Sequence, residues 1–201
     1  SGLLILIVIF QADVRRALTR VGRGLFAPAR MHQAHAIEEI VRACQALAQR
    51  RVGALIAIER ELQTDEFVED GTVLDAELSR DLLISLFLPY SPLHDGAVVV
   101  RRGRVFSAGC ILPLATRGDL PSAFGTRHRA AIGLTEETDA LVVVVSEESG
   151  RIALVASGEI RPDLDGPRLR QALLELTGGE PSVETPTDKD VVADPARALE
   201  T

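Results

Sequence analysis

Pro92-Leu93-His94-Asp95-Gly96-Ala97-Val98-Val99-Val100 is the stretch that organises the chain, because it joins a polar turn to a wholly apolar run. An imidazole, a carboxylate and a glycine suit the entrance to a strand, where a backbone can approach another molecule closely. Asp-Gly, here Asp95-Gly96, is also a common pair of residues in turns. The stretch predicts a buried strand from Val98 and leaves both explanations open for the residues before it.

A second polar stretch is Gly125-Thr126-Arg127-His128-Arg129, which follows a polar loop. Thr126 is expected to cap a helix that carries residues 127–134. Because a helix N-terminus presents free N–H groups and a partial positive charge, two guanidinium groups beside it suit phosphate. A solvated basic turn is the alternative explanation.

The third polar stretch, Ser146-Glu147-Glu148-Ser149-Gly150, follows the apolar run 141–145. One interpretation is a hairpin turn in which Gly150 supplies the bend. The other places the Ser146 hydroxyl on a phosphate oxygen and a glutamate on a divalent metal ion.

The other patterns predict the remaining elements of an α/β protein. In chain order they are a short helix over 13–20, a longer helix over 31–51, a strand over 52–58, a strand or turn over 71–75, a helix capped by Ser79, a hairpin of strands 98–101 and 105–112, strands over 141–145 and 152–156, and a helix from Pro167 to Leu176. Hairpins mixed with covering helices predict a mixed central β-sheet flanked by helices on both sides. The sequence has no Gly-x-Gly-x-x-Gly or Walker-type loop, so another device must hold any nucleotide.

Composition limits the classes of function. The net charge of −7 over 201 residues argues against a general binder of duplex nucleic acid, which needs a basic face. Any phosphate recognition must come from a local cluster of positive charge. Cys44 and Cys110 lie in apolar surroundings without metal-type spacing and predict core residues of a protein in a reducing compartment.

The start of the chain allows two interpretations. Eight apolar residues, 3–10, are followed by Arg15, Arg16, Arg20 and Arg23. Spanning a bilayer takes roughly 20 apolar residues, so this run is either the tail of a membrane segment or a buried first element of a soluble domain. Positive charge directly after the run is typical of the cytoplasmic side of a membrane helix.

Asp95-Gly96-Ala97 and Arg127-His128-Arg129, together with the third stretch, resemble the hallmark motifs of the diadenylate cyclase (DAC) domain. The likeness runs from about Gln11 to about Gly178 and is greatest to the membrane-anchored branch. It implies a membrane-segment tail and juxtamembrane helix over 1–24 and a DAC domain over 25–179. It also implies a place on the cytoplasmic face of the cell membrane. The composition beyond Glu180, with Pro, Thr, Asp and Glu and little to bury, predicts a disordered acidic tail over 180–201.

The resemblance implies that two ATP are condensed into cyclic di-AMP, a bacterial second messenger, with release of two pyrophosphates. In that family pattern Asp95 acts on the attacking 3′-hydroxyl, while His94 and Glu148 hold the metal ion. The ion is Mn²⁺ or Mg²⁺, and imidazole favours Mn²⁺ or Co²⁺. The implied nucleotide-binding residues are Gly96, Ala97, Leu112, Thr126, Arg127, His128, Arg129, Ser146 and Glu147.

Details of base and sugar recognition follow from the same resemblance. Gly96 lets the sugar approach the backbone, the main-chain carbonyl of Leu112 reads adenine, and Thr126 touches the ribose. Ile111 departs from the family, whose members often carry tyrosine there. The loss of that aromatic side chain removes stacking on the base and bears on base selectivity.

The implied partners are ATP, a second copy of the chain and a membrane-bound regulator, but no nucleic acid. The product is two-fold symmetric, which favours a face-to-face homodimer with half an active site on each subunit. Two other classes are open. One is a catalytically silent module that binds ATP or a cyclic dinucleotide, and the other is a structural domain attached to a membrane. Formation of cyclic di-AMP from ATP separates all three.

Overall fold

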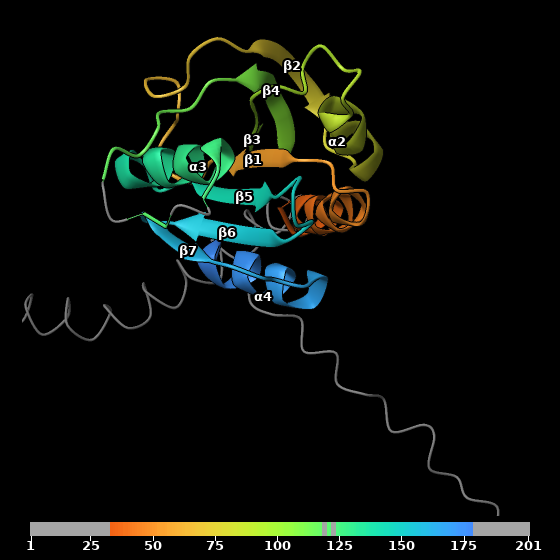
Figure 1. Ribbon diagram of the computed structural model, residues 1–201. Coiled ribbons are helices and arrows are strands. Elements are labelled where there is room, and N and C mark those ends of the chain that lie inside the picture. Colours follow the sequence, from red (N-terminus) through yellow and green to blue (C-terminus); the bar gives the residue numbers. More distant parts are fainter. Residues whose placement is uncertain (1–32, 118–119, 122–123, 179–201) are drawn as a thin grey trace, which may run out of the picture.

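The computed structural model describes residues 33–117, 120–121 and 124–178, and its centre is a mixed seven-stranded sheet (Figure 1). The strands are β1 (Ala54–Ile58), β2 (Thr72–Glu77), β3 (Ala97–Arg101), β4 (Arg104–Cys110), β5 (Leu141–Val145), β6 (Ile152–Ala156) and β7 (Glu159–Arg161). They lie in the order β2-β4-β3-β1-β5-β6-β7. β1 and β3 are parallel, and the other neighbouring pairs are antiparallel.

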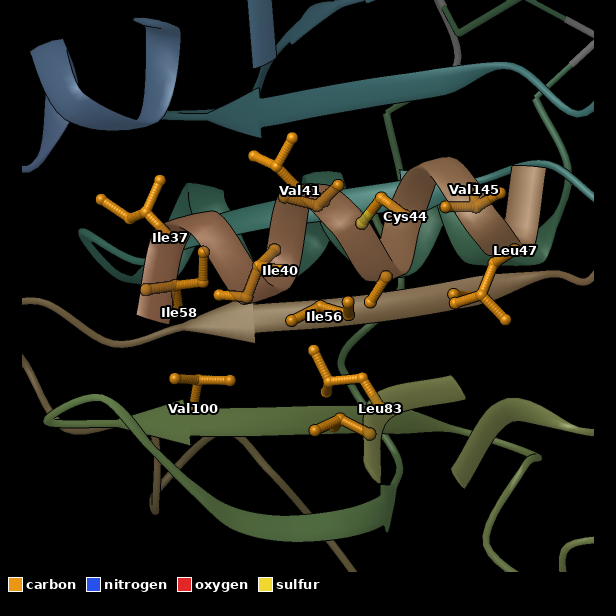
Figure 2. Close-up of a cluster of buried hydrophobic side chains, with 14 of the residues drawn as sticks. Ile37, Ile40, Val41, Cys44, Leu47, Ile56, Ile58, Leu83, Val100 and Val145 are labelled. Atoms are coloured by element: carbon orange, nitrogen blue, oxygen red, sulfur yellow. The ribbon is translucent and has the colours of Figure 1, made fainter. Parts of the chain in front are cut away.

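The helices are residues 33–49, α2 (Arg80–Phe87), α3 (Thr126–Glu137) and α4 (Gly166–Leu176). Apolar residues of the first helix recur at spacings of three and four, which gives it one buried face. Figure 2 shows Ile40 and Leu47 on the side of the helix that faces β1, the strand that carries Ile56. Burial of each such side chain stabilises the fold by ~1.5–3 kcal/mol.

The sheet buries both faces in two separate cores. The first core joins the helix over 33–49, α2 and α4 to alternate strand residues such as Ile56. The second joins α3 and the segment 111–115 to the intervening residues, such as Leu55 and Ala57. Successive side chains of a strand point to opposite faces, so strands covered on both faces are apolar throughout. The predicted fold class is confirmed.

Several predicted boundaries change. The strand or turn over 71–75 is β2, which continues to Glu77 through a register shift where Asp75 has a positive φ of 41°. β7 was not predicted. It forms because Ser157 and Gly158, with φ of 50° and 74°, make a two-residue turn that returns the chain along β6.

Both cysteines are buried, as predicted, and burial raises the pKa of the Cys44 thiol to about 12. Across the part of the chain that the structure describes, no helix has the length and apolar character needed to cross a membrane. The predicted helix over 13–20, the membrane-segment tail over 1–24 and the acidic tail over 180–201 lie outside the described residues.

Candidate functional site

The pairing around β1 decides which loops lie together. β1 runs parallel to β3, with Ile56 beside Val98, and antiparallel to β5, with Ala54 beside Val145. The loops before β1 and β3 and the loop after β5 therefore lie along one edge of the sheet. Two of the three polar stretches identified from the sequence share this edge, although they are far apart in the chain.

The N-terminus of α3 brings the remaining stretch to the same place. Arg127 Nη1 donates a hydrogen bond to Glu147 Oε2 at 2.9 Å. A cleft of about 110 Å³ lies between residues 125–128 of α3 and residues 144–148 at the end of β5. The structure thus brings the Arg-His-Arg stretch and the Ser-Glu-Glu stretch into direct contact.

Thr126 does not cap α3, contrary to the prediction. The cap is Gly125, whose carbonyl oxygen accepts from the backbone N–H groups of His128 and Arg129, and Thr126 is the first helical residue. Glycine has no side chain to satisfy the free N–H groups of the first turn, and the cap makes no side-chain hydrogen bond. This terminus is therefore open to an anionic ligand.

His128 contributes an aromatic ring to this terminus. The ring stacks on Phe124, with centroids 5.2 Å apart and planes 17° apart. Burial disfavours the charged form and lowers the pKa of His128, and the Glu148 carboxylate opposes that effect only partly. At neutral pH the imidazole is uncharged, so the positive charge here comes from Arg127 and Arg129.

The loop after β5 is a turn, as one interpretation predicted. Ser146 Oγ accepts from the backbone N–H of Ser149 at 3.2 Å, and the Ser146 carbonyl accepts from Gly150 at 2.9 Å. Gly150 has a positive φ of 70°, which supplies the bend. The Ser146 hydroxyl keeps its proton available for donation, and the carboxylates of Glu147 and Glu148 are exposed.

His94 and Asp95 lie at the entrance to β3. Asp95 is exposed, while His94 is half-buried with Nδ1 2.6 Å from the carbonyl oxygen of Ser91. A carbonyl only accepts, so this contact assigns the proton of the neutral ring to Nδ1. The lone pair of Nε2 is then available to bind a metal ion.

Gly96 has a structural requirement of its own. Its φ is +123°, and a Cβ atom would lie 2.7 Å from the carbonyl oxygen of Cys110 on β4. The close approach of β4 thus accounts for glycine here, and the expected approach of a sugar stays a prediction. Ala97 and Leu112 are 0% and 5% exposed, so their side chains are not accessible to a nucleotide, and the expected backbone contact at Leu112 stays a prediction. Ile111 is largely exposed beside them.

The described residues hold no group of three or more His, Cys, Asp or Glu side chains arranged to bind a metal ion. His94 and Glu148 would therefore need further ligands. Phosphate oxygens of a substrate fit that need, because metal ions in nucleotide sites often combine one or two protein ligands with phosphates.

Gly53 belongs to this site and was missed in the sequence. It lies directly before β1, and a Cβ atom there would meet the Arg127–Glu147 pair. In the sequence it is a glycine beside a predicted buried strand, and that pattern does not show which distant side chains pack against it.

The comparisons with known proteins agree on one family. Residues 41–160 match the DAC family, described as "DisA bacterial checkpoint controller nucleotide-binding". A diadenylate cyclase of Listeria monocytogenes is 42% identical over 90% of this chain and 70% of its own length. The cyclic di-AMP synthase CdaA of Bacillus subtilis is 41% identical over 86% of this chain and 65% of its own length.

Solved structures agree with the sequence relatives. A double mutant of DacA from Staphylococcus aureus superposes with a TM-score of 0.69 and 38% identity, covering 72% of this chain and 97% of that one. A hypothetical membrane spanning protein from Bacillus cereus gives a TM-score of 0.64 and 38% identity, covering 79% of each chain.

Proposed function

This chain belongs to the DAC family, and on that basis we propose that it is a diadenylate cyclase, a nucleotidyltransferase that makes cyclic di-AMP from ATP. The observation that supports the proposal is a shared edge of the sheet: the loop before β3, which carries Asp95, and the loop after β5, whose Glu147 pairs with Arg127 at the open terminus of α3, both lie there. The α3 terminus supplies positive charge that suits a triphosphate. The loop before β3 supplies the Asp95 carboxylate, which can accept a proton from a hydroxyl group.

The reaction is two equivalent transfers. The 3′-hydroxyl oxygen of each ATP forms a bond to the α-phosphorus of the other, and the bond from that phosphorus to the pyrophosphate oxygen breaks. Asp95 orients the hydroxyl or accepts its proton, and its exposure leaves it accessible to a substrate. Two pyrophosphates leave with one cyclic di-AMP.

The triphosphate is bound by the N-terminus of α3. Arg127 and Arg129 contribute charge and paired N–H donors, while the free backbone N–H groups and the Ser146 hydroxyl add hydrogen bonds. Neutral His128 donates a hydrogen bond rather than charge. Thr126 contacts the ribose, and the backbone at Leu112 reads adenine beside exposed Ile111.

A divalent metal ion, when bound, offsets the negative charge of the reacting phosphates. His94, through Nε2, and the carboxylate of Glu148 would hold such an ion together with phosphate oxygens of the substrate. An imidazole ligand favours Mn²⁺ or Co²⁺ over Mg²⁺, which prefers oxygen.

The working enzyme is a homodimer at the cytoplasmic face of the membrane. Cyclic di-AMP is two-fold symmetric, so two subunits facing each other each supply one ATP and one set of motifs. The Bacillus cereus neighbour described as membrane spanning supports attachment through the N-terminal region, where a membrane-bound regulator would also act.

One assay tests the function. The chain is incubated with ATP and Mn²⁺, and cyclic di-AMP is measured by mass spectrometry. Asp95→Asn should lower product formation ~10²–10⁴-fold while ATP binding persists, because the proposed triphosphate ligands lie on α3 and at Ser146. ATP binding without product in the unmodified chain would instead support a silent nucleotide-binding module. Unchanged turnover in the Asn variant would remove Asp95 from the mechanism.

A further inference from the structure

Gly53 lies against the ion pair that joins α3 to the loop after β5. It is buried directly before β1. A Cβ atom built on it would lie 2.7 Å from Arg127 Nη1, 2.8 Å from Arg127 Cζ and 2.9 Å from Glu147 Oε2. Carbon atoms do not approach other heavy atoms this closely without displacing them. The space that this pair occupies is available only because residue 53 has no side chain.

The backbone at this position does not itself demand glycine. Gly53 has a φ outside the left-handed region, so an alanine could adopt the same backbone conformation. Gly96 differs, because both its φ and the neighbouring backbone of β4 require glycine. At Gly53 the three atoms nearest to the added Cβ all belong to the side chains of Arg127 and Glu147.

We propose that Gly53 is a positioning residue, which lets the Arg127 guanidinium lie against Glu147 at the open terminus of α3. The inference rests on the proposed function for what Arg127 binds, but not for where Arg127 lies. A guanidinium recognises phosphate through a planar fork of N–H donors, so its orientation matters as much as its charge. A methyl group at residue 53 would turn that fork away.

An alanine at residue 53 is expected to affect nucleotide binding without affecting folding. The atoms that an alanine would displace are the ends of two long side chains, which are 26% exposed for Arg127 and 59% exposed for Glu147. Both can move toward solvent. Gly53→Ala is therefore expected to fold with an unchanged melting temperature and to carry a misplaced guanidinium.

The first test observes Arg127 directly. In a ¹H–¹⁵N spectrum of the full chain, the side-chain Nε–H signal of Arg127 is identified by its loss in Arg127→Lys. Gly53→Ala should move that signal. Gly166→Ala is the matched control, because its Cβ also meets a flexible side chain, that of Gln45, but at the start of α4. An Arg127 signal that stays in place in Gly53→Ala would overturn the proposal.

The second test measures binding of 3′-deoxy-ATP with Mn²⁺, since this nucleotide lacks the attacking hydroxyl. Gly53→Ala should weaken binding roughly tenfold, the scale of a charge-assisted hydrogen bond. In an Arg127→Ala background the same substitution should have no further effect on binding, because the guanidinium whose position it changes is gone. Equal losses in both backgrounds would overturn the proposal.

Different measurements bear on the proposed cyclase activity and on the positioning role of Gly53. Failure of the unmodified chain to form cyclic di-AMP would count against the function, while the Arg127 signal would still decide the role of Gly53. Conversely, full cyclase activity with an unmoved Arg127 signal in Gly53→Ala would keep the function and remove the positioning role.

Discussion

The proposed metal site depends on His94, because Nδ1 contacts the carbonyl oxygen of Ser91 and only Nε2 is then available to bind a metal ion. We predict that His94→Ala raises the Mn²⁺ concentration for half-maximal cyclic di-AMP formation by at least roughly tenfold, since even indirect metal contacts are worth that much. Nucleotide binding without metal should change little. His94→Asp restores an oxygen ligand and should shift preference toward Mg²⁺.

The control for this experiment is His35→Ala, which removes an exposed imidazole from the helix over 33–49. Its Mn²⁺ titration should match that of the unmodified chain. A normal titration in His94→Ala would show that His94 is not a ligand.

Glu59 is a buried carboxylate at the other edge of the sheet. Its side chain is 4% exposed and accepts from Arg101 Nε at 2.5 Å and from the Thr64 hydroxyl at 2.7 Å. Burial alone would raise the pKa of Glu59, but the hydrogen bonds from Arg101 and Thr64 outweigh burial and lower it. The carboxylate therefore stabilises the fold in its charged form.

The lowered pKa of Glu59 makes the free energy of unfolding fall at acidic pH. Because the pKa of Glu59 is lower in the folded chain, its contribution is complete above the unfolded value, about 4.3, and is lost as pH falls through the folded value. Glu59→Gln should lower the free energy of unfolding by ~1–3 kcal/mol at pH 7 and make it less dependent on pH below about 5. Urea unfolding at a series of pH values measures both.

Asp65→Asn is the matched control, because Asp65 contacts the same Arg101 but is largely exposed. It should change stability less, since exposed ion pairs contribute little. If the free energy of unfolding had the same dependence on pH in Glu59→Gln as in the unmodified chain, Glu59 would not stabilise the fold as a charged group.

The sequence identified candidate site residues only where a motif carried them. Asp95 and Arg127 stood out because their neighbours in sequence formed a pattern. Gly53 did not, because its constraint comes from side chains far along the chain. Thr126 is a good capping residue, yet it is the first residue of α3, and the cap is Gly125. Local preference alone could not place that boundary.

At the scale of elements, α3 is held by a close contact with the segment that follows β4. A Cβ on Gly133 would meet the carbonyl oxygen of Pro113 and lie 2.7 Å from the backbone nitrogen of Ala115. Ala115 N in turn donates to the Arg129 carbonyl oxygen at 3.0 Å. Backbone atoms cannot move aside as flexible side chains can.

We therefore predict that Gly133→Ala destabilises the protein by ~1–3 kcal/mol through overpacking, although alanine favours helices over glycine. It should also weaken ATP binding, because the displaced segment carries Leu112. Chemical denaturation and nucleotide binding measure the two effects. Glu137→Ala, an exposed change to alanine on the same helix, should be close to neutral. Unchanged stability in Gly133→Ala would contradict the contact.

The strands differ in how far the sequence predicts them. The predicted strands over 141–145 and 152–156 coincide with β5 and β6, because a strand buried on both faces is apolar throughout. β7 has one half-buried residue, Ile160, between exposed Glu159 and Arg161. Three such residues give no pattern of their own, and they form a strand only through pairing with β6.

At the scale of the whole molecule, the fold class follows from hairpins mixed with helices, but the strand order does not. The central place of β1, parallel to β3 and antiparallel to β5, depends on pairing between segments distant in sequence. That pairing places two of the three polar stretches along one edge, and the contact of Arg127 with Glu147 brings the third to it. The sequence indicates candidate site residues, while long-range contacts determine which of them meet.

The last prediction concerns assembly. If each subunit holds half of the active site, only the dimer forms product, and the dimeric fraction falls with concentration by mass action. Cyclic di-AMP formed per subunit should then fall roughly tenfold for each tenfold dilution once monomers predominate. ATP binding per subunit should stay constant, because the α3 terminus and its arginines lie on one chain. Rates and sizing over one dilution series measure both. Constant activity per subunit at concentrations where sizing shows only monomers would mean that one chain holds a complete site.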